Sequence, residues 1–372
     1  MKHKHLKGLN TLRFFAAFLV VIYHGKHHVN KMGVDFAENW TIFNRGIEAV
    51  SFFFVLSGFL ITFLAINEIN YRGRVNYKNF FLRRVFRIMP LYYLILFLML
   101  FFLGFAAPKL LSQENVLVFP MLKGTLLYVF MIPNLVKPLW PDIPGGMNIF
   151  WSIGVEEQFY LIFPVLIYLY LKSKNKVYTL LTVFLLYYIC YMLVYYNVFN
   201  LNQVLVKFIL TLKFHYMLMG MTLAEFAQKA ILKEKLVKLI NKDIYQLVSF
   251  GLVICFLFLD IEYPKLLEDI LLCLIFSNLI FVVAFRTRGS LLNYNVKFLS
   301  YFGVISYGIY LIHPLASYFV RMLIVKIQFL NKLFINYPII YIMILFMVTL
   351  LCSHVSYKFF EKPFLKFKEK FR

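Results

Sequence analysis

Residues 9–28 read LNTLRFFAAFLVVIYHGKHH, an apolar run with one arginine near its start and histidines near its end. A helix of about 20 mostly apolar residues is long enough to cross a bilayer. Stretches of similar length and character recur along the 372-residue chain, at 46–67, 86–107, 151–171, 178–197, 206–225, 244–260, 266–285, 298–320 and 338–358. We therefore expect an all-α, polytopic membrane helix bundle with about ten transmembrane helices.

The composition also favours a membrane protein. Hydrophobic residues make up 62% of the chain and aromatic residues 20%, whereas soluble domains are about 45–50% apolar. The net charge of +22 could suit nucleic acid, but the basic residues lie between apolar stretches and not on a soluble domain. We expect a lipid bilayer and an anionic ligand or headgroup as partners, and no nucleic acid. The four cysteines show no CxxC spacing, so neither a metal site nor a disulfide framework is indicated.

The basic residues also predict the topology. Six segments are rich in Lys and Arg, namely the N-terminus, 68–87, 172–176, 229–242, 286–297 and the C-terminus. They alternate with connections poorer in basic residues, and an even number of spans then places both ends in the cytoplasm. We expect a multi-pass protein of the inner, cytoplasmic membrane, with a single domain at 9–364 and short basic cytoplasmic tails at 1–8 and 365–372. The apolar segment 115–135 is bracketed by prolines and could lie at the interface or re-enter.

The first of the polar features is on the opening helix. Arg13 and His24 are eleven residues apart, a spacing that returns to within roughly 20° of the same direction and advances about 16 Å along a helix. With Arg13 near the cytoplasmic interface, His24 falls in the outer half of the bilayer, where ionisable side chains are costly and usually functional. Histidine exchanges a proton near neutral pH, so His24 is a candidate proton acceptor. The alternative is a histidine that only helps helices to pack.

The second feature is a pair of arginines, Arg84 and Arg87, at the predicted cytoplasmic mouth of a span. The guanidinium group binds phosphate through paired N–H donors. The pair therefore predicts a site for an anionic ligand, although basic residues at such a position also serve the topology.

The third feature is the run NIFWSIGVEEQFY at 148–160. Ser152 and Glu156 share one face of a helix, and Glu157 lies beside them on another face. Two adjacent carboxylates in a span are costly and hard to explain as lipid contacts. We expect Glu156 to orient a histidine or a substrate hydroxyl.

A fourth candidate, His313, precedes a proline in SYGIYLIHP at 306–314. It lies about 24 Å along a helix from Lys297, which puts it in the outer half of the bilayer with His24 and Glu156. The proline frees a backbone carbonyl around which a neighbouring side chain can reorganise. His313 is therefore either a substrate-binding residue or a structural partner of that carbonyl.

Taken together, these motifs resemble the acyltransferase 3 family of membrane O-acyltransferases. Arg13 and His24, with ten residues between them, fit the family's R/K-x10-H motif, while 84–87 fits its RxxR motif and 152–156 its SxxxE motif. Further family-like segments are FFVLSGFL at 53–60, SYGIYLIHP at 306–314 and YKFFEKP at 357–363. The resemblance runs over almost the whole chain. The sequence contains no SGNH-type esterase-like domain, which some members append, so we expect the chain to work alone or with a separate extracytoplasmic partner.

The resemblance implies transfer of an acyl group, usually acetyl from cytoplasmic acetyl-CoA, to a hydroxyl of a cell-surface glycan or lipid-linked sugar. Arg84 and Arg87 would hold the CoA phosphates. His24 would deprotonate the acceptor hydroxyl or accept the acyl group itself, with Glu156 orienting it. Acyl-CoA is then a substrate, and no cofactor is bound permanently. The donor could also be succinyl-CoA or a longer acyl-CoA.

Two other classes of protein remain as alternatives. A proton-coupled transporter or flippase also carries intramembrane His, Glu and Arg residues, but the sequence shows no paired repeats and no Gly/Pro-broken helices in matching halves. For a non-catalytic membrane scaffold, the shared depth of His24, Glu156 and His313 would be accidental.

Overall fold

The computed structural model describes residues 6, 8–108, 120–229, 238–239, 241–261, 263–285 and 296–371. Within these residues the chain forms helices and connecting loops, without a β-strand. The prediction of an all-α fold is therefore confirmed. Parts of the basic segments predicted at the N-terminus, 229–242 and 286–297, and the beginning of the segment 115–135, lie outside the described residues.

Seven helical segments are long and apolar enough to cross a membrane. They comprise α2 (Gly46–Arg72), α3 (Tyr77–Phe101) with η2 (Phe102–Ala106), α7 (Gly145–Asn148) with α8 (Phe150–Lys172), α9 (Lys176–Tyr195), α10 (Gln203–Leu212) with α11 (Phe214–Gln228), α14 (Lys265–Phe285), and α18 (Pro338–Ser356) with η4 (Tyr357–Glu361) and α19 (Lys362–Glu369). An eighth is formed if α15 (Lys297–Val304) and α16 (Ser306–Lys326), which are bent by 67°, count as one broken span. The described residues thus form a polytopic helix bundle.

This count of seven or eight is lower than the expected ten, although all ten predicted stretches fall on helices. α1 (Leu9–Asn30) has 22 residues, but its polar side chains lower its apolarity. α13 (Asp243–Phe258) has 16 residues, whereas a bilayer core needs about 20. The described part of 115–135 contains the nine-residue α5 (Met121–Val129), which is also too short. Further short helices are η1 (Thr41–Asn44), η3 (Pro133–Leu135), α6 (Val136–Leu139) and α17 (Gln328–Asn336).

The break between α15 and α16 changes the expected depth of His313. On one straight helix His313 would lie about 24 Å from Lys297, but the 67° bend turns α16 away from the direction of α15. The position of His313 is set instead by the packing of α16 against α1 and α18.

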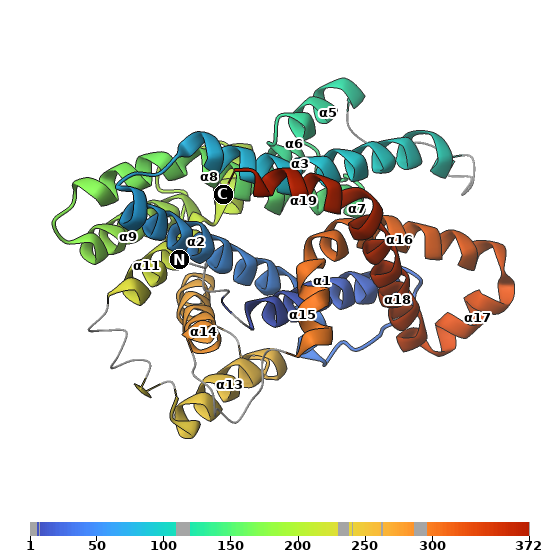
Figure 1. Ribbon diagram of the computed structural model, residues 1–372. Coiled ribbons are helices and arrows are strands. Elements are labelled where there is room, and N and C mark those ends of the chain that lie inside the picture. The colour runs from blue at the N-terminus through green and yellow to red at the C-terminus, as the bar shows by residue number, and fades with distance from the viewer. Residues whose placement is uncertain are drawn as a thin grey trace.

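Close packing between helices fixes the buried side of α2. Its main neighbour is α11, and two glycines bring the backbones together. A Cβ added to Gly220 would lie 2.1 Å from the carbonyl oxygen of Val55, and one added to Gly58 would lie 2.1 Å from that of Met217. Small residues allow such contact between membrane helices. On its other side α2 packs against α1, which also contacts α15, α16 and α18 (Figure 1).

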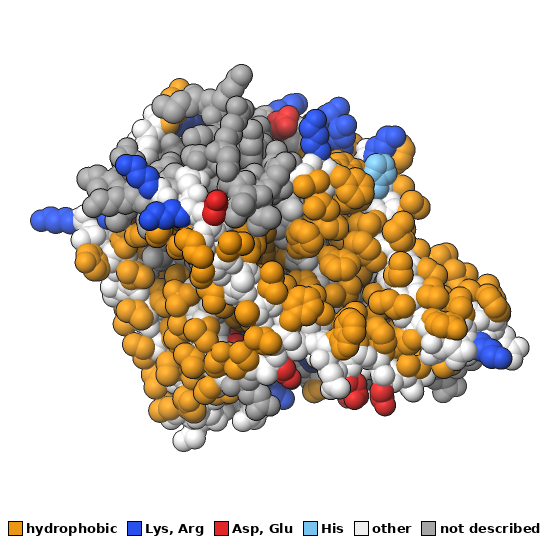
Figure 2. Space-filling view, turned by 90° about the horizontal axis from the view of Figure 1, so that it is seen from below, with side chains coloured by type: hydrophobic (Ala, Val, Ile, Leu, Met, Phe, Trp, Pro, Cys, Tyr) orange, Lys and Arg blue, Asp and Glu red, His pale blue; other side chains and the backbone are white. Residues whose placement is uncertain are grey.

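The surface of the bundle suits a lipid environment. Figure 2 shows a broad area of hydrophobic side chains across one face. Large apolar residues such as Phe97, Leu161 and Leu351 are 64%, 69% and 69% exposed. A water-soluble monomer rarely exposes apolar surface on this scale.

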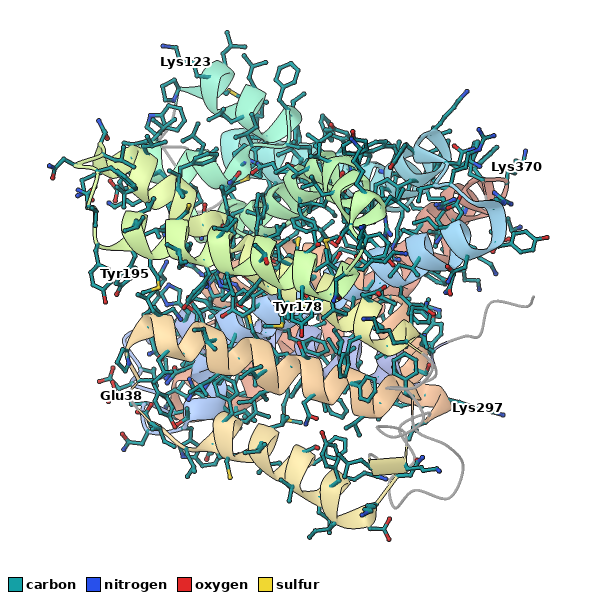
Figure 3. All side chains as sticks on the ribbon, turned by 90° about the vertical axis from the view of Figure 1, so that its left-hand side faces the viewer. Glu38, Lys123, Tyr178, Tyr195, Lys297 and Lys370 are labelled. Atoms are coloured by element: carbon teal, nitrogen blue, oxygen red, sulfur yellow. The ribbon has the colours of Figure 1, made fainter. Side chains whose placement is uncertain are left out.

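The two ends of the bundle differ in the segments that they carry. In Figure 3, Lys297 and Lys370 lie at one end, which we call the basic end, and Glu38 and Tyr195 lie at the opposite end, which we call the far end. Lys297 closes one predicted basic connection and Lys370 belongs to the C-terminal tail. Two predicted basic segments therefore share an end of the bundle, as the positive-inside rule requires.

Candidate active site

The polar residues of α1 divide between two clusters. Arg13 lies near the start of the helix and His24 near its end, so they are about 16 Å apart along the axis. The loop that follows α1 contains Glu38, at the far end (Figure 3). Arg13 therefore lies toward the basic end and His24 toward the far end.

The first cluster, the arginine cluster, consists of Arg13, Arg84, Arg87 and Glu156. The guanidinium group of Arg13 interacts electrostatically with Arg87, Glu156 and Arg84. Arg87 also interacts with Arg84 and Glu156. These residues come from α1, α3 and α8, so the arginine of the R/K-x10-H motif, both arginines of RxxR and the glutamate of SxxxE lie in one place.

Glu156 is held by two neutral hydroxyl groups. Its Oε1 accepts hydrogen bonds from Ser57 on α2 and from Tyr160 one turn along α8. The same Tyr160 ring lies 5.0 Å from the guanidinium carbon of Arg84, measured to the ring centroid. Sequence reasoning missed Ser57 and Tyr160, although Ser57 lies in the family-like segment 53–60.

The arginines of this cluster keep donors available for a ligand. Among the described residues, Arg13, Arg84 and Arg87 form no ion pair with a carboxylate, although they share one neighbourhood with Glu156. Arg13 donates to Asn10 Oδ1 at 3.3 Å, and Arg84 Nε is buried without a hydrogen-bond partner. Three guanidinium groups with free N–H donors suit a phosphate-bearing ligand.

The second cluster, the histidine cluster, consists of His24 and His28 on α1 and His313 on α16. The imidazole centroids of His24 and His313 are 5.0 Å apart. His28 Nε2 lies 3.0 Å from Ser317 Oγ. Sequence reasoning missed His28, although a position four residues after His24 lies on nearly the same helix face.

Pro314 determines which ring nitrogen of His313 has a hydrogen-bond partner. Pro314 has no N–H, so it leaves unpaired the carbonyl four residues earlier, that of Tyr310. His313 Nδ1 lies 2.6 Å from this oxygen, and because a carbonyl only accepts, Nδ1 carries the proton. His313 Nε2 is buried without a hydrogen-bond partner. Its lone pair is therefore available to take a proton from a ligand.

Ser152 lies on the same face of α8 as Glu156, one turn nearer the start of the helix, where it contacts α16. Its Oγ lies 2.7 Å from Tyr310 Oη, and the Tyr310 hydroxyl donates to Ile149 O at 3.1 Å. Glu156, one turn further along, lies with the arginines. Among the described residues Glu156 forms no hydrogen bond with His24; its partners are Ser57 and Tyr160, and it lies within electrostatic reach of Arg13.

Glu157 belongs neither to the arginine cluster nor to the histidine cluster. Its Oε1 is buried without a hydrogen-bond partner, and it interacts electrostatically with Glu156 and Arg84. It therefore borders the arginine cluster from another face of α8, and in the described structure it has no hydrogen bond or ion pair with the three histidines.

A pocket of about 40 Å³ opens beside the histidine cluster, room for roughly three ordered waters. It is lined by His24, His27, His28, Lys31, Gly146, Ile149, His313, Pro314, Tyr318 and Arg321. His27 and Lys31 are exposed, whereas His313 is fully buried. The pocket thus leads from the surface after α1 to the pair of histidines.

A family model described as an acyltransferase domain matches residues 6–357. O-acetyltransferase OatA of Staphylococcus aureus strain NCTC 8325 / PS 47 is 27% identical over 386 residues. A putative O-acetyltransferase, SACOL0978, of S. aureus strain COL is 27% identical over 387 residues. Both alignments cover 98% of this chain and 58% of the relative, so the chain spans a little over half of the length of these relatives. No solved structure matches the chain significantly.

Proposed function

Because the chain belongs to the acyltransferase 3 family, we propose that it transfers an acyl group from acyl-CoA at the basic end to a hydroxyl of a glycan or lipid-linked sugar at the far end. The observation that carries this proposal is the separation of the arginine and histidine clusters by about 16 Å on one helix. The names of the relatives describe O-acetyltransferases, which supports acetyl as the group transferred. The basic end is then the cytoplasmic side of the inner membrane.

The arginine cluster is the proposed donor site. Arg84 and Arg87 bind the phosphates of acyl-CoA with N–H donors that no carboxylate of the described residues occupies, and Arg13 adds a third guanidinium group. Glu156, fixed by Ser57 and Tyr160, keeps the three arginines together before the ligand binds. The acyl-pantetheine arm then follows α1 toward His24.

The histidine cluster is the proposed reaction site. The acceptor hydroxyl gives its proton to an imidazole nitrogen as its oxygen attacks the thioester carbonyl. The C–S bond breaks, and the CoA thiolate leaves and takes up a proton. His24 acts either as this base or as a carrier that receives the acyl group first. His313 Nε2, with its free lone pair 5.0 Å away in terms of ring centroids, binds the hydroxyl or relays its proton.

The proposal is tested with purified protein, labelled acetyl-CoA and a cell-surface glycan extract, in detergent without any gradient. We expect label in the glycan, with a mass increase of one acetyl group, and no transfer by His24→Ala. The exposed Lys332→Gln on α17 serves as a matched control. Wild-type transfer by His24→Ala would remove the catalytic role of His24. Labelled glycan in this closed-system assay also argues against the transporter alternative, because transport leaves the acceptor chemically unchanged.

A further inference from the structure

Among the residues that the structure describes, the polar lining of the pocket beside His24 and His313 is mainly basic and includes no carboxylate. Besides the histidines it contains the basic side chains of Lys31 and Arg321. Lys137 adds a further positive charge close to His27. The acidic residues of the loop after α1, Asp35 and Glu38, are exposed and do not line the pocket.

Within the described part of the chain, these two basic side chains have no acidic partner. Across the residues that the structure describes, neither Lys31 nor Arg321 forms an ion pair or donates a hydrogen bond to a carboxylate. Two other lysines, Lys26 and Lys265, do have partners. Lys26 donates to Ala37 O at 3.0 Å and to Asn44 Oδ1 at 2.8 Å, and Lys265 Nζ lies 2.8 Å from Glu268 Oε2.

The positions of the cations suit a ligand that enters the pocket. Arg321 lies eight residues after His313 on α16, about 12 Å along the helix toward the surface. It interacts electrostatically with His28 and with Tyr318, both of which line the pocket. A ligand with its hydroxyl at the histidines would therefore extend toward Arg321 and Lys31.

We propose that the acyl acceptor carries a carboxylate or phosphate near the hydroxyl that is acylated, and that Arg321 and Lys31 bind this anionic group. This inference rests on the function proposed above and adds the chemical class of the acceptor. The guanidinium group matches both anions with paired N–H donors. Bringing an anion into a partly buried pocket of unpaired cations also restores charge balance where water is scarce.

The test uses three acceptor probes and purified protein in nanodiscs of phosphatidylcholine. Methyl β-glucoside and methyl β-glucuronide differ by a carboxylate, and glucose 1-phosphate supplies a phosphate. Acetyl transfer and the shift in Tm caused by each probe are measured separately. We expect kcat/KM for the anionic probes to exceed that of the glucoside about tenfold, as for a charge-assisted contact. In Arg321→Gln this ratio should fall toward one, whereas Lys332→Gln, which removes an exposed charge outside the pocket, should keep it.

The outcomes separate this inference from the proposed function. Transfer without an anionic preference, or with the preference unchanged in Arg321→Gln, would overturn the inference and leave the acyltransferase proposal standing. If no probe is acylated, the acyltransferase proposal loses support. The Tm shifts then test whether the pocket binds an anionic group. A shift by the glucuronide or the phosphate that is lost in Arg321→Gln supports it, and equal shifts for all probes overturn it. If the preference for anionic probes disappears in nanodiscs of phosphatidylglycerol, Arg321 and Lys31 bind an anionic lipid headgroup and not the acceptor.

Discussion

Replacing His313 by Asn distinguishes the role of its Nδ1 nitrogen from that of its Nε2 nitrogen. The amide nitrogen of Asn lies where Nδ1 of histidine lies, so it can donate to the carbonyl of Tyr310 that Pro314 leaves free. No atom of Asn occupies the position of Nε2. The variant therefore keeps the buried hydrogen bond and removes the nitrogen that has no hydrogen-bond partner in the structure.

The expected changes in stability and in transfer rate are different. Because the 2.6 Å contact to Tyr310 is retained, the variant should avoid most of the 0.5–1.5 kcal/mol that a net hydrogen bond is worth, in rough terms. Loss of a general base or proton relay should lower the rate of acetyl transfer by about 10²- to 10⁴-fold. His313→Gln is the matched comparison, because its amide reaches the position of Nε2 but cannot take up a proton and leaves the Tyr310 carbonyl unpaired.

The assay is single-turnover transfer of labelled acetyl from bound acetyl-CoA, with the Tm and the Kd for acetyl-CoA measured on the same samples. We expect His313→Asn to keep a Tm close to that of the wild type and an unchanged Kd, and to lose transfer. His313→Gln should lose transfer and also unfold at a lower temperature. A His313→Asn protein that transfers acetyl at more than about a tenth of the wild-type rate would refute the role of Nε2 in proton transfer.

Three further predictions concern other parts of the molecule. His24→Ala should abolish acetyl transfer while acetyl-CoA still binds, as measured by equilibrium binding, since the donor site lies about 16 Å away. Arg84→Ala and Arg87→Ala should each raise the Kd for acetyl-CoA about tenfold through loss of a charge-assisted contact, and an unchanged Kd would leave these arginines as topology signals. Gly220→Ala should lower stability by about 1–3 kcal/mol or more, because its Cβ would lie 2.1 Å from a backbone oxygen of α2; Gly251→Ala, with nothing within 4 Å, should not, and thermal unfolding in detergent compares the two.

Much of the framework follows from properties local to the chain. The length and apolarity of each stretch determine the helices, because backbone hydrogen bonds must be satisfied inside lipid. The spacing of Arg13 and His24 determines their shared face and their separation along α1, because helix geometry is regular. The free carbonyl at Tyr310 follows from Pro314 in the same way. The family membership shown by the match at 6–357 was also readable from the motifs.

The tertiary structure decided which polar groups meet. Glu156 was expected near His24, but the packing of α8 against α2 pairs it with Ser57, 99 residues away in the chain, and places it beside Arg13. The contact of His28 with Ser317 spans 289 residues. The two basic side chains of the pocket likewise come from separate segments, Lys31 directly after α1 and Arg321 on α16. Contacts of this kind depend on which helix faces pack together. The packing energy that selects these faces is summed over many side chains, so no local spacing in the sequence encodes it.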